Sequence, residues 1–147
     1  MTFKNGFQIL DQRVVKLNFG INDQFTAKED TKAVDLAPVM NMVYEKESEN
    51  KIIATLSIKI AGDDVPFHLE IFLSGFFQLA GDQMSDEALD KLVHINCAGV
   101  LFPFLRQIVA DTTLKGGFQQ LLLPSVNFVE SYKDLIAQRK ATEEIED

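Results

Sequence analysis

Hydrophobic and polar residues alternate along the first half of the chain, which is the period-2 pattern of strands that bury one face. The charged segment 45–50 and Gly62-Asp63-Asp64 predict turns between such strands. Four strands with connections of hairpin length predict an antiparallel sheet. The alternating stretches are 15–22, which Phe7 and Ile9 extend toward the N-terminus, 34–44, 52–60 and 67–74.

The pattern changes to a helical period after residue 81. Ser85, followed by two acids, predicts an N-cap whose first turn carries negative charge opposite the positive end of the helix dipole. Apolar residues between Leu101 and Thr112, spaced i, i+3, i+4, i+7 and i+11, predict one face of a long helix. Lys115-Gly116-Gly117 predicts its C-terminal end.

Pro103 falls inside this helical stretch and lacks the N–H group that a helical hydrogen bond needs. Two outcomes remain open from the sequence. The helix either starts near Asn96 and kinks at Pro103, or it breaks there.

A final helix is predicted after a leucine-rich segment. Asn127 and Glu130 have the spacing of a capping box, and Phe128 and Tyr132 begin one apolar stripe. We expect this helix to be short and to end in a frayed polar tail over residues 140–147.

The length and charge of the chain limit its class. It has 147 residues and a mass of 16.5 kDa, so we expect one domain over residues 1–147. Lys and Arg number 14 and Asp and Glu number 22, which gives a formal net charge of −8. Such a chain is repelled by phosphate backbones and anionic membrane surfaces, so we expect no nucleic acid partner.

The sequence also predicts where the protein works. The first residues, MTFKNGFQIL, lack the basic region, apolar run and small-residue cleavage site of a secretory signal. The uncharged runs 92–105 and 116–129 are shorter than the roughly 20 apolar residues of a spanning helix. One cysteine, Cys97, forms no disulfide within the chain. We therefore expect a cytoplasmic protein without direct membrane insertion.

Residues that could support catalysis or bind a metal are few. His94 and Cys97 have the spacing of a thiolate and base pair on a helix, but their neighbours are apolar packing residues, so we interpret Cys97 as a buried small hydrophobe. His68, His94 and Cys97 lack the local spacing of a zinc site. We expect no enzyme activity, catalytic residue, metal or cofactor.

Aromatic composition is the unusual feature of this sequence, because Phe occurs 12 times, Tyr twice and Trp not at all. One sheet and two helices cannot bury all of the apolar side chains on a single face. We expect the surplus to form subunit contacts or a binding groove.

Five segments of the chain together are similar to the SecB family of export chaperones. They agree with the family in order and spacing over most of the chain. The segments are Phe7-Gln8-Ile9, 75–81 (GFFQLAG), 100–106 (VLFPFLR), Gly116-Gly117-Phe118 and 121–128 (LLLPSVNF).

This resemblance implies an α+β fold. Its parts are a four-stranded antiparallel sheet, one long helix packed on it and a short C-terminal lid helix, with the subunits forming a dimer of dimers, which is a homotetramer. It also implies an ATP-independent holdase that binds unfolded preproteins and delivers them to the SecA motor. By the same resemblance, the apolar positions of the client groove and lid are Phe25, Phe67, Phe104, Leu121, Phe128 and Tyr132.

The chain departs from the family where the motor docks. Lys16 and Gly20 stand at first-strand positions that are acidic in the family, and His68 replaces an apolar residue. Glu70 is the acid that the resemblance leaves for docking SecA. A second family branch therefore stays open, in which the chaperone serves one partner, the antitoxin of a toxin-antitoxin system, without motor docking.

Overall fold

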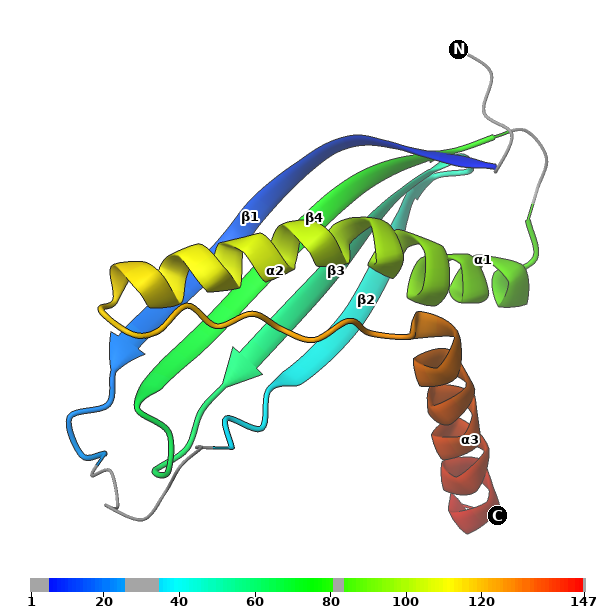
Figure 1. Cartoon of the computed structure of the whole chain (residues 1–147). Coiled ribbons are helices and arrows are strands. Elements are labelled where there is room, and N and C mark those ends of the chain that lie inside the picture. Colours follow the sequence, from blue (N-terminus) through cyan, green and yellow to red (C-terminus); the bar gives the residue numbers. More distant parts are fainter. Residues whose placement is uncertain (1–5, 26–34, 81–83, 147) are drawn as a thin grey trace.

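A computed structural model describes residues 6–25, 35–80 and 84–146. Four antiparallel strands form one sheet in the order β1-β4-β3-β2. One long helix, Asp86–Lys115, crosses a single face of this sheet, and the C-terminal helix lies beside its β2 edge (Figure 1). The strands are β1 (Phe7–Ile21), β2 (Val39–Ser48), β3 (Lys51–Ile60) and β4 (Phe67–Leu79).

The strand alternation seen in the sequence produces the core. On β3, the apolar residues at every second position are at most 2% exposed, and β4 continues the same face. These side chains pack against the helix residues Leu101, Leu105 and Val109, each 0% exposed. The expected antiparallel sheet and its extension through Phe7 and Ile9 are confirmed.

Two expectations about the strands are wrong. The first strand pairs with β4, so the connection between β1 and β2 crosses the sheet and is not a hairpin. Residues 45–48 continue β2, where Glu45 lies opposite Ile53, although their charge had indicated a turn. The second difference follows from β2 being an edge strand, because a strand end facing water tolerates charge. Position 34, the expected start of this strand, lies outside the described residues.

The long helix is continuous from residue 86 to residue 115. It consists of α1 (Asp86–Leu92), a π-helical turn η1 (Val93–Cys97) and α2 (Ala98–Lys115). Ser85 caps it as expected, because its hydroxyl oxygen accepts a hydrogen bond from the Ala88 N–H at 3.1 Å. The irregular turn is η1 and not Pro103, so the expected break, and the expected start near Asn96, are wrong.

Pro103 is tolerated because it lies on the exposed side of α2. The carbonyl that loses its partner belongs to Gly99, which is also exposed, so water can bond to it. The helix Asp86–Lys115 is long and apolar enough to cross a membrane when only length and composition are considered, although each uncharged run in the sequence is shorter than a spanning helix. Helices in the core of soluble proteins meet the same criterion, and the buried residues of this helix pack on the sheet.

The glycine pair ends α2 as expected. Gly117 has φ +86°, the N–H of Gly117 bonds to the Leu114 carbonyl and the N–H of Phe118 bonds to the Thr113 carbonyl. This is the two-bond Schellman cap, which needs a left-handed residue and hence favours glycine. The chain then returns along α2 (Figure 1), where Arg106 donates to the Leu123 carbonyl at 2.6 Å.

The C-terminal helix α3 (Phe128–Glu146) begins at its predicted cap, since the Asn127 side-chain oxygen accepts from the N–H groups of Val129 and Glu130. It has 19 residues against 18 in α2, so the expectation of a short helix is wrong. Residues 140–146, expected to be a frayed tail, are helical. Alternating acids and bases along an exposed helix obscure its length in the sequence.

Candidate functional site

Helix α3 covers a cavity of about 420 Å³ at the β2 edge of the sheet. Met40 and Met42 reach its floor because alternate residues of β2 face the helices, and Leu56 of β3 adjoins them. Phe128 and Leu135 form part of the opposite wall, seven residues apart on one side of α3. The cavity is therefore apolar on two sides and can hold a large apolar side chain.

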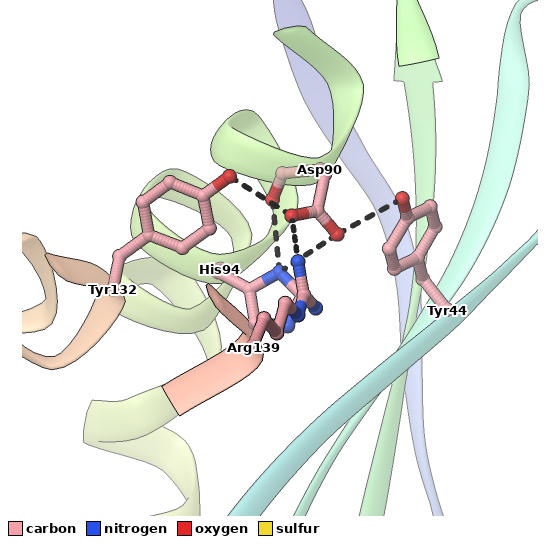
Figure 2. Close-up of polar contacts among 5 residues, drawn as sticks. All are labelled: Tyr44, Asp90, His94, Tyr132 and Arg139. Carbon is pink, nitrogen blue, oxygen red and sulfur yellow. Dashed lines mark hydrogen bonds and ion pairs between the residues drawn. The ribbon is translucent and has the colours of Figure 1, made fainter. Parts of the chain in front are cut away.

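The polar part of the site centres on the carboxylate of Asp90 in α1, shown in Figure 2. Tyr132 of α3 donates to Asp90 at 2.9 Å, and Tyr44 of β2 donates at 3.2 Å. Arg139 of α3 forms an ion pair with the same carboxylate at 2.7 Å. Asp90 thus joins three elements through one side chain that is 16% exposed. We call Asp90, Tyr44, Tyr132 and Arg139 the Asp90 hub.

His94 completes the surroundings of Asp90. Its Nδ1 lies 2.9 Å from the Asp90 carbonyl oxygen, which can only accept, so Nδ1 carries the proton. The same nitrogen is 3.5 Å from the carboxylate. The imidazole ring lies between the rings of Tyr44 and Tyr132, at centroid distances of 6.1 and 5.6 Å. His94 belongs to η1, and π-helical turns are found frequently at functional sites.

Proton affinities in the hub favour charge-assisted hydrogen bonds. Burial by itself raises the pKa of Asp90, but hydrogen bonds from Arg139 and Tyr132, together with nearby positive charge, outweigh burial and leave the pKa below its ordinary value. Burial and the bond to Asp90 raise the pKa of Tyr132 to about 12. At neutral pH Asp90 is therefore an anion that accepts from a neutral phenol and a cationic guanidinium.

A second cavity, of about 850 Å³, lies on the other side of the hub. Ile95, Val129 and Ile136 supply its apolar residues, and acids and bases of both signs surround them. Tyr132 and Arg139 line both cavities. The Asp90 hub therefore lies between two cavities beneath α3.

The structure brings together only two of the six residues expected in the client groove, Phe128 and Tyr132. Phe67 is 3% exposed and packs on Phe118 at 4.9 Å and on Phe19 at 5.6 Å. Phe104 is 45% exposed on α2.

The last two groove candidates also lie outside the cavity lining. Leu121 is partly buried in the segment after α2, where its N–H bonds to the Thr113 hydroxyl. Phe25 is partly buried in the loop after β1.

Glu70 lies on the opposite face of the sheet. Lys16 pairs with it at 2.5 Å and Lys59 at 3.9 Å. The hydrogen bond from Lys16 holds the pKa of Glu70 below its ordinary value. Lys16 and Arg13 also lie over the rings of Phe72 and Phe76, so basic groups cover this part of the face.

Cys97 is 0% exposed, and burial raises the pKa of its thiol to about 12. The interpretation of Cys97 as a packing residue is consistent with this environment, because the thiolate is the reactive form. Among the described residues, no group of three His, Cys, Asp or Glu side chains is arranged to hold a metal ion.

Sequence reasoning missed Asp90, Arg139 and Tyr44. A usable signal existed for part of the hub. Tyr132 and Arg139 are seven residues apart, so they lie on one face of their helix. Asp90 and His94 are four residues apart and likewise share a helix face. Nothing local indicated that these pairs meet, since Asp90 is 42 residues from Tyr132 and 49 from Arg139.

Comparisons with known proteins place this fold and site in context. Residues 5–139 match the family described as preprotein translocase subunit SecB. The protein-export protein SecB of Sinorhizobium medicae is 30% identical, over 93% of this chain and 83% of that protein. Its counterpart in Agrobacterium fabrum is 28% identical, over 99% of this chain and 98% of that protein.

A solved structure shares the fold. The SecB-like chaperone of Mycobacterium tuberculosis, in complex with a peptide from the HigA1 antitoxin, has a TM-score of 0.62 and 14% identity. The match covers 82% of this chain and 91% of that chain. A Streptococcus agalactiae protein of unknown function matches with a TM-score of 0.51, also at 14% identity, over 81% of this chain and 97% of that one.

Proposed function

The chain belongs to the SecB family of protein-export chaperones, and from this we propose that it is an ATP-independent holdase of the cytoplasm. It binds unfolded preproteins and keeps them soluble and competent for export. The observation that carries the proposal is the cavity beneath α3, which has apolar residues on two sides, under a helix whose described side chains, 128–145, are all at least partly exposed. Because α3 is held by few buried side chains, the site beneath it can admit chains of different sequence.

The energetics suit a holdase. Burying one large apolar side chain of a client contributes about 1.5–3 kcal/mol to the binding free energy. A client that fills only the cavity of about 420 Å³ is therefore bound weakly. Several such contacts along one unfolded chain add by avidity. Phe128 and Tyr132 are the proposed central contacts. Phe25, Phe104 and Leu121 remain proposed secondary contacts for a client longer than the cavity. Phe67 is 3% exposed, so a client would reach it only after Phe19 and Phe118 move.

We propose assembly as a homotetramer. β1 is an edge strand in this sheet, and its Leu10, Val15 and Leu17 are between 49% and 58% exposed. Exposed edge strands of this kind pair with other strands, which would join two sheets into one of eight strands. Phe104 and Leu114 leave apolar groups exposed on α2 for contact between dimers. Sedimentation at micromolar concentration should give a tetramer, and a stable monomer would exclude this assembly.

The alternative is a chaperone dedicated to one antitoxin. One observation favours it: Glu70, the acid left for docking SecA, is paired with Lys16 and Lys59. The structural neighbour from Mycobacterium tuberculosis carries an antitoxin peptide. Calorimetric titration with purified SecA discriminates between the two, because the export chaperone binds the motor and the dedicated chaperone does not.

Light scattering tests the holdase itself. A near-stoichiometric amount of tetramer should suppress aggregation of a chemically denatured client in the absence of ATP. Leu135→Asp places a carboxylate in the cavity wall, where desolvation is costly, and should reduce suppression at least five-fold. Ile145→Asp is the matched control on the same helix, because Ile145 is 85% exposed. If the wild type does not suppress aggregation, the proposed holdase activity is refuted. If both variants lose suppression equally, the cavity is not the client site.

A further inference from the structure

Resting on the proposed function, we propose that Asp90 is a latch that holds α3 over the cavities, and that its release joins the two cavities into one groove for an extended apolar segment. Asp90 touches no client in this scheme. It acts through α3, as a positioning residue. The latch therefore determines whether the site takes a single side chain or several consecutive residues.

The first support is the weak apolar attachment of α3. None of its side chains over 128–145 is fully buried, and Phe128, Tyr132, Leu135 and Ile136 are only partly buried. Phe128 packs edge to face on Phe102 at 5.7 Å, which anchors the first turn. Beyond that turn, apolar burial alone holds the helix weakly.

The second support is the position of the hub bonds along α3. Tyr132 and Arg139 lie about two helical turns apart, and both bind the one carboxylate of Asp90. Figure 2 shows Tyr132 and Tyr44 on opposite sides of Asp90, with Arg139 reaching the carboxylate from below. Of the ion pairs made by the described residues of α3, only that of Arg139 reaches another element, since Lys133 pairs with Glu130 within the helix. Asp90 is therefore the polar connection between α3 and the rest of the fold.

The third support is the partition of the space under α3. Tyr132 and Arg139 line both the cavity of about 420 Å³ and that of about 850 Å³. When they leave Asp90, the two side chains that both cavities share no longer hold the cavities apart. Met42 and Leu135 on one side and Ile95 and Ile136 on the other then lie along one groove, which suits an extended chain with apolar side chains.

The test uses the full-length protein and measures the latch separately from client binding. Amide hydrogen exchange is followed in Asp90→Asn and Arg139→Gln, without client. We expect exchange over 132–146 to become at least ten-fold faster while that of β3 and β4 is unchanged. Asp111→Asn is the matched control, because Asp111 is exposed on α2 and bonds only to Gln107 of its own helix.

Tyrosine emission supplies a second readout. The chain has two tyrosines and no tryptophan, and both phenols donate to Asp90. Emission should rise in Asp90→Asn because a carboxylate hydrogen bond quenches a phenol. Arg139→Lys retains the charge and should restore slow exchange over 132–146.

Client capture then tests the groove. Fluorescein-labelled, reduced and carboxymethylated α-lactalbumin, which stays unfolded, should associate at least three-fold faster with Arg139→Gln than with wild type. Unchanged exchange over 132–146 in both variants would overturn the latch, as would an equal rise across the whole chain in Arg139→Gln. Unchanged association with faster exchange would overturn the gating of the groove. Failure of the wild type to bind this probe would instead refute the holdase, because the exchange measurement needs no client.

Discussion

Gly75 lies on β4 under the crossing point of α2, and adding one methyl group there tests how closely the helix packs on the sheet. A Cβ atom on Gly75 would lie 2.5 Å from Cε2 of Phe77 and 2.9 Å from Cδ2 of Leu101. Ordinary carbon contacts are 3.5–4.0 Å. The Phe77 ring and Leu101 would have to move by roughly 1 Å, in a core where they are 1% and 0% exposed.

Overpacking of this kind costs about 1–3 kcal/mol. For a chain of 147 residues, each kcal/mol lowers Tm by roughly 2–4 °C. We therefore expect Gly75→Ala to melt about 2–12 °C below wild type in differential scanning calorimetry. Gly20→Ala is the control, because Gly20 is also a strand glycine but a Cβ there meets nothing within 4 Å. Its Tm should be unchanged or slightly higher.

A double variant separates overpacking from other causes. Leu101→Ala alone should cost about 2–5 kcal/mol through the cavity it leaves. In Gly75→Ala with Leu101→Ala, the new methyl group occupies part of that cavity, so the loss should be smaller than the sum of the two single losses. Strict additivity, or a Gly75→Ala protein that melts at or above wild type, would refute the reasoning.

Three further predictions concern the thiol, the hub and the helix end. Cys97 should react with a disulfide reagent at pH 8 about 1000-fold more slowly than in the unfolded chain, because a pKa raised from 9.0 to about 12 removes the thiolate; equal rates would contradict its burial. The folded pKa of Asp90 lies below its ordinary value of 3.8, so its stabilising effect is complete above that pH and is lost as the pH falls through the folded pKa. Tyrosine emission should therefore stay constant from neutral pH down to the ordinary pKa of 3.8 and rise only as the pH falls through the lower folded pKa, and a change centred near neutral pH would be evidence against the hub. Gly117→Ala should lower stability by about 1 kcal/mol in a urea titration, because φ +86° strains any residue with a Cβ; an unchanged midpoint would contradict the cap.

The amino-acid sequence by itself determined the features that depend on near neighbours. The alternation over 52–60 predicts a strand with one buried face because successive side chains point to opposite sides. The caps at Ser85, Gly117 and Asn127 form from residues within a few positions of each other. Such interactions are the same in any fold, so local pattern is sufficient to predict them.

Only the tertiary structure decided which distant segments meet. The place of β1 beside β4 leaves β2 at the edge, and that is why its charged end stays in the sheet and why α3 can lie beside it. The π-helical turn carries His94 to the space between Tyr44 and Tyr132. Asp90 collects donors from residues 42–49 positions away. No local pattern encodes these meetings, because the partners are far apart in the sequence and come within hydrogen-bonding distance only once the sheet and helices have packed.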